Sequence, residues 1–237
     1  MWYDFGMTTI YSSFLKDLRE QRGLSQAEVA TMIKMSRPSY VAVEKGTKEL
    51  SLSEAVAIVH FFGITLDELL RVQTSNLSKY KQMLLAFLRE AKNDEQVLKK
   101  TKLAKLLYLA DFSWYYLHHE SMSGMMYRKV DFGPVSDAYF RLLDEMEQQG
   151  ELNIIQVIRD DYHMYEIEET RASQKIKLDL LTKDELKHIG KIWKKWADAN
   201  TAEIVAFTHK QLPYVFAKDN EVVSYEVFTQ ENQSEIY

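Results

Sequence analysis

The side chains that could perform catalysis in this sequence are a few aspartate, threonine and histidine residues. Asp111 could act as a general base, and Thr208 with His209 are the types of a nucleophile and its base. Neighbours on a helix point about 100° apart, so Thr208 and His209 do not face each other, and His118 and His119 cannot share a metal. The other histidines are scattered and the chain has no cysteine, so no metal site is predicted.

Asp111 follows the apolar run "KLLYLA", which is typical of a buried helix. We expect a buried carboxylate there, accepting hydrogen bonds from nearby N–H groups or from Tyr127 or Arg128. Glycine-rich loops that cradle phosphates are absent from the sequence. We therefore predict neither a cofactor nor an enzymatic activity. An enzyme fused to a DNA-binding module remains a weaker alternative.

The composition is that of a soluble globular protein of one or two domains. The 237 residues are 46% apolar and 27% charged, with a formal net charge of −5. Three prolines and eight glycines favour mostly helical structure, and the lack of cysteine fits a reducing cytoplasm. No apolar run approaches the ~20 residues that span a bilayer, and the first residues do not read as a signal peptide. We expect a cytoplasmic protein without a membrane partner.

Short helices with explicit start signals are predicted between residues 11 and 70. Ser25-x-x-Glu28, Ser51-x-x-Glu54 and Thr65-x-x-Glu68 are capping boxes that precede apolar-periodic runs. Ser36 can cap the helix between the first two boxes, with Pro38 in its first turn. Two short helices joined by "KMS" are the helix-turn-helix arrangement, in which the second helix enters the major groove of DNA.

Residues 10–71 resemble the phage-repressor-like family of helix-turn-helix proteins through "LSQAEVA", "SRPSY", "VEKG" and "FFGITLDELL". The resemblance implies that Gln26 braces the phosphate backbone and the recognition side chains, and that Arg37, Pro38 and Ser39 form the exposed start of the recognition helix. Tyr40 and Val43 match core positions. Lys34 stands at a turn position that is usually glycine, where it would strain the backbone or require a different turn.

Charge gives moderate support for DNA binding by this segment. Residues 1–75 hold eight basic and nine acidic side chains, but the basic ones gather near the turn and the recognition helix. The candidates for phosphate contacts are Arg22, Lys34, Arg37, Lys45 and Lys48. Val41 and Ala42 can touch a thymine methyl group but cannot form a hydrogen bond with a base edge. The alternative is a scaffold used only for dimerisation or partner binding.

A polar, linker-like stretch at 71–79 separates this segment from a second block. Its expected elements are helices over 79–92 and 101–119, an amphipathic helix over 135–149, a β-hairpin over 153–169, a helix from Thr182, a last helix ending at Pro213, and a possible strand in "NEVVSYEVF". Helices followed by a hairpin permit a winged-helix shape. Residues 135–149 carry one basic and four acidic side chains, so DNA binding by this half is rejected.

"KLAKLLYLADFSWYY", "SG..YRKVDFGPV" and "FTHKQLPY" resemble, in this order, the Panacea domain over about residues 99–216. Ser123-Gly124 stands where the family usually has Thr-Gly. The motif positions are Lys105, Tyr108, Asp111, Gly124, Tyr127, Arg128, Gly133, Pro134 and His209. The resemblance implies an antitoxin that neutralises a toxin by direct binding, and one branch resembles adaptors that deliver a partner to a protease.

The Met-rich loop at 121–135 has two readings. It either forms an adaptable partner surface, with Tyr127 and Arg128 as anchors, or it folds onto the core. If it is core, the hairpin at 154–168 becomes the expected partner site.

The expectation from the sequence is a mainly α (α+β) protein of two domains. Residues 1–74 form the helix-turn-helix domain, and residues 75–237 form a helical Panacea-like domain with a small hairpin or sheet. The implied partners are a cognate protein toxin, operator DNA, a second copy in a homodimer, and a cellular protease in the adaptor reading. The alternative function is a transcription regulator whose C-terminal half senses a ligand or oligomerises.

Overall fold

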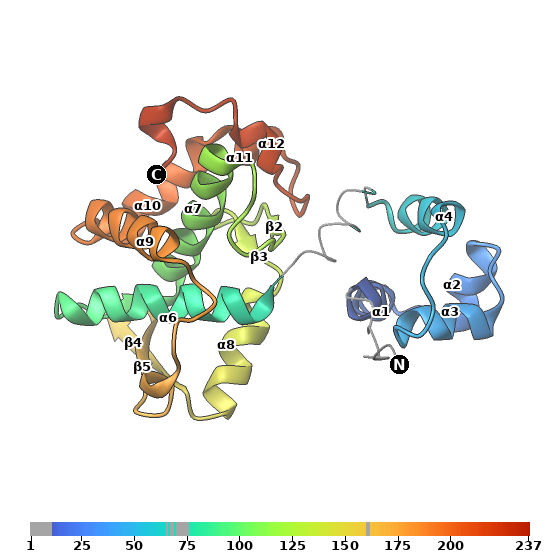
Figure 1. The fold of residues 1–237 in the computed structure, drawn as a ribbon, viewed down its shortest axis with the longest axis horizontal. Helices are drawn as coiled ribbons and strands as arrows, with labels where there is room; N and C mark the ends of the chain where they lie inside the picture. Colours follow the sequence, from blue (N-terminus) through green and yellow to red (C-terminus); the bar gives the residue numbers. More distant parts are fainter. Residues whose placement is uncertain (1–10, 65, 67–68, 70–75, 160–161) are drawn as a thin grey trace, which may run out of the picture. The chain divides into compact units, whose positions relative to one another are not determined.

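The computed structural model describes residues 11–64, 66, 69, 76–159 and 162–237. The chain divides into two compact units, Met1–Ser75 and Asn76–Tyr237, and each is described by itself (Figure 1). No helix of the described residues is both long enough and apolar enough to cross a membrane. The mainly helical α+β fold expected from the sequence is confirmed.

The N-terminal unit contains four described helices, and the last three begin directly after the serine residues predicted to cap them. They are α1 (Tyr11–Gln21), α2 (Gln26–Met32), α3 (Arg37–Glu44) and α4 (Leu52–Phe62). Ser25 and Ser51 form complete capping boxes with Glu28 and Glu54, as predicted, and Ser36 accepts a hydrogen bond from the Ser39 N–H. The expected box at Thr65–Glu68 lies outside the described residues, as do residues 71–75 of the expected linker.

The core of this unit is built from one face of each helix. Leu15, Val29, Tyr40, Val43 and Ile58 are fully buried. Tyr40 and Val43 are therefore core residues of α3, as predicted, and they fix which face of that helix stays outside.

The C-terminal unit is built around α7 (Lys100–His118), whose residues from Lys102 to Ser113 are all buried. Helices α6 (Leu77–Asn93), α9 (Lys183–Trp196), α10 (Thr201–Lys210) and α12 (Tyr225–Phe228) pack against α7 (Figure 1). The remaining helical segments are α8 (Tyr139–Gln148), α11 (Leu212–Phe216) and the 3-10 turns Ser173–Lys175 and Gln233–Glu235. A helix that is apolar on all sides is thus placed at the centre, as its sequence predicts.

Two small antiparallel sheets complete this unit. Strands β1 (Leu98–Lys99), β4 (Leu152–Arg159) and β5 (Tyr162–Glu169) form a sheet in the order β1-β5-β4. Strands β2 (Tyr127–Arg128) and β3 (Val135–Ser136) pair with each other. The order α6-β1-α7-α8-β4-β5, with the first strand paired to the last, is a winged-helix-like arrangement, with α8 in the place of the recognition helix.

Three expectations for this unit need correction. Helix α8 begins at Tyr139 rather than at 135, because Val135 and Ser136 pair with β2. The helix expected to end at Pro213 ends at Lys210, and Pro213 lies in the first turn of α11. "NEVVSYEVF" is not a strand, because only Val222 forms a bridge, to Arg128, and Ser224 then caps α12.

Candidate functional site

The expected DNA-reading surface lies at the start of α3 and in the turn before it. Arg37 and Pro38 occupy the first two positions of α3 and are exposed, as are Lys34 and Lys45. Gln26, Ser39 and Val41 are partly exposed. The sequence-predicted residues are therefore exposed or partly exposed, while Tyr40 and Val43 are buried.

A carboxylate at the end of α3 ties this helix to its two neighbours. Glu44 accepts hydrogen bonds from Arg19 Nε at 2.6 Å and Nη2 at 3.0 Å, and from Gln26 Nε2 at 2.8 Å. Burial alone would raise the pKa of Glu44, but the hydrogen bonds from Arg19 and Gln26 outweigh it and lower that pKa. Sequence reasoning missed the Arg19–Glu44 pair, although Glu44 lies within the quoted "VEKG". Here Gln26 positions α3 against α2.

The turn between α2 and α3 stores backbone strain at Lys34. Its φ is +56°, in the left-handed region that side chains with a Cβ disfavour. Of the two outcomes expected for a lysine at this position, the structure shows the strained backbone. The exposed Lys34 side chain supplies a positive charge beside the start of α3.

Two of the five basic residues expected at phosphates are engaged inside the unit. Arg22 donates to the carbonyl oxygens of Phe61 and Phe62, at 3.3 and 2.5 Å, at the end of α4. Lys48 pairs with Glu54 at 2.7 Å. The candidates with a freely exposed position are Lys34, Arg37 and Lys45.

In the C-terminal unit the motif residues converge on a buried network around Asp111. Its carboxylate accepts hydrogen bonds from the Ser123 N–H at 2.7 Å, the Ser123 hydroxyl at 2.5 Å and the Tyr127 hydroxyl at 2.7 Å. Burial raises the pKa of Asp111 to about 6, against the opposing effect of these hydrogen bonds. The predicted buried carboxylate is confirmed, and its side-chain partners are Ser123 and Tyr127 rather than Arg128.

An aromatic cluster surrounds this network. The Tyr108 ring lies 4.3 Å from Phe112 and 5.6 Å from Tyr127 between ring centroids, and Phe112 stacks on Tyr225 at 4.0 Å. The Tyr108 hydroxyl is buried and has no hydrogen-bond partner among the described residues. Tyr108 therefore contributes to the unit through its ring.

A second buried contact joins the loop to α7 and α10. The Lys105 ammonium donates to the Pro134 carbonyl at 2.7 Å, and burial lowers the pKa of Lys105 to about 7. Gly133 has a φ of +87°, and a Cβ built there would lie 2.9 Å from Thr208 Oγ1 and 3.2 Å from His209 Cδ2. Only glycine fits this crossing without displacing its neighbours.

The outer side of the loop is held by segments near the C-terminus. Arg128 Nε donates to both carboxylate oxygens of Asp137, at 2.8 and 2.9 Å, and Arg128 Nη1 donates to the Asn220 carbonyl. His209 stacks on Tyr214 with 4.4 Å between ring centroids, and the Tyr214 hydroxyl donates to the Val130 carbonyl. Gly124, with a φ of +70°, turns the chain at the start of the loop.

The expectation that Tyr127 anchors a partner from an exposed loop is wrong. Tyr127 is fully buried, and Met122, Met125 and Met126 are at most 8% exposed, because the loop folds onto α7. Lys105, Tyr108, Asp111, Gly133 and Pro134 are buried as well. These motif residues build the unit and cannot contact a partner on its surface, whereas Arg128 and His209 are partly exposed.

The residue pairs of catalytic type among the described residues are engaged in hydrogen bonds within the unit. Thr208 donates to the Val205 carbonyl of its own helix rather than facing His209. Ser113 Oγ lies 2.7 Å from His188 Nε2, a contact that the sequence did not indicate. The Ser113 hydroxyl donates its hydrogen bond to the Leu109 carbonyl at 2.5 Å. Burial lowers the pKa of His188 to about 4. His188 is therefore the donor in this buried pair and not a base. Within the described ranges, no three His, Asp or Glu residues are grouped as a metal ion would require.

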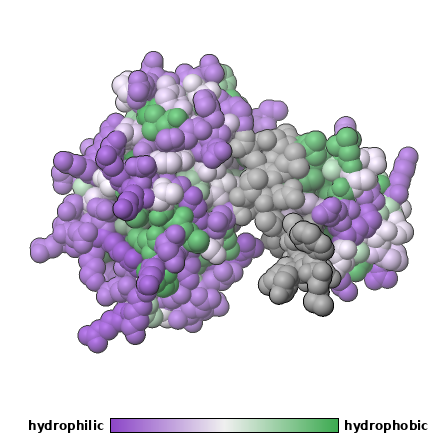
Figure 2. Space-filling view, in the orientation of Figure 1, coloured by the Kyte–Doolittle hydropathy of each residue, from purple (hydrophilic) through white to green (hydrophobic). Residues whose placement is uncertain are grey.

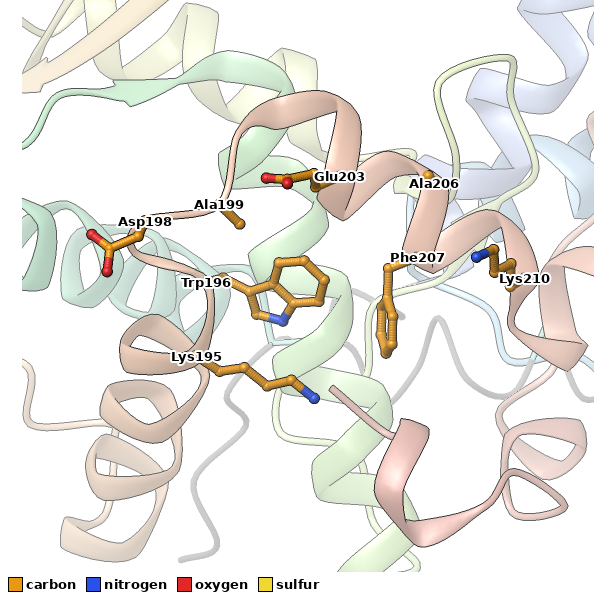
Figure 3. Close-up of a pocket in the computed structure, with 8 residues that line it drawn as sticks. All are labelled: Lys195, Trp196, Asp198, Ala199, Glu203, Ala206, Phe207 and Lys210. Atoms are coloured by element: carbon orange, nitrogen blue, oxygen red, sulfur yellow. The ribbon is translucent and has the colours of Figure 1, made fainter.

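An open groove of about 630 Å³ lies between the end of α9 and α10 (Figure 3). Trp196 and Phe207 meet at its centre, with 4.9 Å between ring centroids. Lys195 lies over the rings of Phe207 and Tyr237 and donates to the Tyr237 main-chain oxygen. Phe207 and Lys210 of the "FTHKQLPY" stretch line the groove, and its charges have mixed sign.

Comparison with known proteins agrees with both parts of this description. Residues 15–69 match the family model "Helix-turn-helix", and residues 103–213 match "Antitoxin SocA-like, Panacea domain". The chain joins a helix-turn-helix domain to a Panacea domain. Both families are non-enzymatic regulators, one of DNA-binding and one of antitoxin-like type.

A curated relative of the helix-turn-helix domain is the cryptic phage CTXphi transcriptional repressor RstR of Vibrio cholerae. It is 34% identical over 70 residues, which are 30% of this chain. The chain spans 63% of the length of that relative. No solved structure matches the chain significantly.

Proposed function

We propose that this protein is the antitoxin of a toxin–antitoxin pair and the repressor of its own operon. The observation that carries the proposal is that one chain combines an exposed recognition-helix start at Arg37 with a C-terminal segment that matches the Panacea antitoxin model. The C-terminal unit neutralises a protein toxin by direct binding. The N-terminal unit binds the operator.

The DNA-binding part of the proposal rests on local charge rather than net charge. Lys34 and Arg37 are exposed at the start of α3 and Lys45 is exposed just after its end, and charges farther than about 10 Å are screened at ordinary salt. Arg37 is the side chain best placed to reach a base edge, because it stands at the first position of α3. Since repressors of this architecture read palindromes, we propose that the protein binds DNA as a homodimer.

The toxin-binding part rests on the Panacea unit. Most of its motif residues lie in the core, with Arg128 and His209 partly exposed, so the partner binds mainly to other parts of its surface. A binding protein needs no reacting groups. In the buried Ser113–His188 pair the histidine donates to the serine, whereas a catalytic base would accept the serine proton. Neutralisation either blocks the toxin directly or delivers it to a protease.

The experiment starts from the neighbouring reading frame. Its product is expressed alone, with the full chain, and with a fragment of residues 76–237. We expect growth arrest in the first case and growth in the other two. A solitary gene, or a harmless neighbour, would favour the alternative of a ligand-sensing regulator.

The DNA-binding part is tested separately with Arg37→Ala. Gel-shift titration on the gene's own promoter should show binding weakened by ~1–3 kcal/mol, while rescue from the toxin is unchanged. Lys16→Ala on α1 is the matched control, since it removes an equal charge from an exposed position on another helix. Equal loss in both variants would mean that Arg37 does not read a base.

A further inference from the structure

The sheet of the C-terminal unit has an open edge at β4. The strand order is β1-β5-β4, and no strand among the described residues pairs with the outer side of β4. β4 has eight residues and pairs with β5 along its whole length without a bulge, from Leu152↔Glu169 to Arg159↔Tyr162. A regular edge of this length presents a row of main-chain donors and acceptors to a further strand.

The direction of these groups is fixed by one contact. The Ile154 N–H donates to Glu147 Oε1 at 3.3 Å, so it points away from β5. Because main-chain groups alternate in direction along an antiparallel strand, the N–H and C=O groups of Gln156 and Ile158 also point to the open edge. Glu147 covers the edge at Ile154, and the edge beyond it is uncovered by any described residue.

β4 lacks the features that normally protect an edge strand. Its sequence, LNIIQVIR, contains no proline and no lysine, and the pairing has no bulge. Ile158 is 62% exposed and Ile155 is 43% exposed, on opposite faces of the strand. An added strand would bury apolar side chains on both faces and satisfy main-chain groups at the same time.

Acidic side chains beside the β4 edge favour a partner strand that carries positive charge. Helix α8, which packs beside β4, presents Asp144 and Glu147 at exposed positions, and Glu145, also exposed, pairs with Arg141 at 3.9 Å. On β5, Glu168 is also exposed. Two copies of β4 paired with each other would bring two acidic α8 helices together, which like-charge repulsion opposes.

We propose that the β4 edge binds an extended, apolar and basic segment of a partner protein by adding it as a fourth strand. The partner's main chain pairs with Gln156 and Ile158, its apolar side chains cover Ile155 and Ile158, and its lysine or arginine side chains face the carboxylates of α8. The inference rests on the proposed function only in naming the toxin as the partner. The strand chemistry itself follows from the edge.

The first test uses the full chain and two synthetic peptides that need no knowledge of the toxin. Both are blocked eight-residue peptides, one alternating lysine with valine and the other alternating glutamate with valine. Amide NMR spectra should show shifts at residues 152–158 with the lysine peptide and none with the glutamate peptide. Absence of these shifts with the lysine peptide, or equal shifts with both peptides, overturns the proposal. So do shifts at residues 152–158 that depend on protein concentration without peptide, since a second copy would then occupy the edge.

The second test removes one outward-facing donor. Ile158→Pro deletes an N–H that points away from β5, so the hairpin retains its own hydrogen bonds, whereas Ile158→Thr shortens the side chain and keeps the N–H. We expect Ile158→Pro to weaken lysine-peptide binding about tenfold or more relative to Ile158→Thr, with closely similar melting temperatures. Equal affinity of the two variants overturns main-chain pairing. If Ile158→Pro melts early, Gln156→Pro against Gln156→Thr makes the same comparison.

The third test uses the toxin itself. When the neighbouring gene product is toxic and the wild-type chain rescues growth, Ile158→Pro should lose rescue and Ile158→Thr should keep it. Failure of the wild-type chain to rescue contradicts the proposed function, while the peptide result stands on its own. Rescue by Ile158→Pro places the toxin elsewhere and overturns the inference for that partner.

Discussion

The Tyr127 hydroxyl lies 2.7 Å from the Asp111 carboxylate, and both groups are fully buried between α7 and the loop that follows it. This contact joins two of the three Panacea motif stretches through the interior of the unit. It explains why a tyrosine and an aspartate are required there without either of them reaching the surface. The pair holds the loop to the helix on which the unit is built.

Removing the Tyr127 hydroxyl should therefore destabilise the C-terminal unit. Tyr127→Phe leaves Asp111 with one fewer donor in a buried site, for which we expect a loss of ~1–3 kcal/mol in the free energy of unfolding. Tyr108→Phe is the matched control, because the buried Tyr108 hydroxyl has no partner among the described residues. It should leave the melting temperature unchanged or raise it. Equal destabilisation by both changes in denaturant titrations would contradict the assigned network.

Asp111 should also give stability a measurable pH dependence. Its pKa is about 6 in the folded protein and 3.8 as an ordinary aspartate, so the folded state holds its proton more tightly. As the pH rises from about 4 to about 6, the wild type should lose up to ~3 kcal/mol of stability relative to Asp111→Asn, which does not titrate. Denaturant titrations of both proteins across this range measure the difference. A constant or rising difference would show that Asp111 is ionised throughout.

Gly133 should tolerate no side chain. Gly133→Ala places a Cβ 2.9 Å from Thr208 Oγ1 and also forces a φ of +87° on alanine. We expect a loss of ~2–4 kcal/mol in unfolding free energy. Gly150→Ala is the control for the cost of the positive φ alone, because Gly150 has a φ of +69° and nothing lies within 4 Å of the added Cβ. It should lower the unfolding free energy by only ~1–2 kcal/mol. If the two variants have the same melting temperature, the close approach of α10 is not the reason for glycine at position 133.

Lys34 should oppose folding and favour DNA binding. Lys34→Gly relieves a φ of +56° and should stabilise the N-terminal unit by ~1 kcal/mol. Lys34→Ala retains the strain, so it should not raise the melting temperature. Both variants lose the charge, and both should lower the slope of log affinity against log salt by about one unit on promoter DNA. An unchanged slope in both would remove Lys34 from the phosphate contacts.

The elements that the sequence predicts best are those with local causes. Capping boxes at Ser25, Ser51 and Thr182 place helix starts correctly because the hydrogen bonds lie within three residues. The hairpin β4–β5 and the buried α7 follow from apolar periodicity. Asp111 was predictable as a buried carboxylate because a charge on an apolar helix must be paired.

The errors come from contacts between distant segments. Val135 and Ser136 continue an amphipathic pattern but pair with β2, which delays α8. Met125 and Tyr127 have the composition of a binding loop, and only the fold shows that α7 covers them. The Arg19–Glu44 pair spans 25 residues of sequence, so no spacing rule indicated it.

The loop 121–136 is completed by chain that lies almost a hundred residues later. Val223 N–H donates to the Tyr127 carbonyl, Lys129 N–H to Glu221, and Asn220 N–H to Lys129. Contacts of such high contact order form late, because a long chain must be closed before they stabilise anything. During synthesis the Panacea motif therefore cannot complete these contacts until residues 217–228 have left the ribosome. A nascent chain that already carries a folded N-terminal unit still lacks a finished C-terminal unit, so the proposed operator binding would become available before the proposed toxin binding.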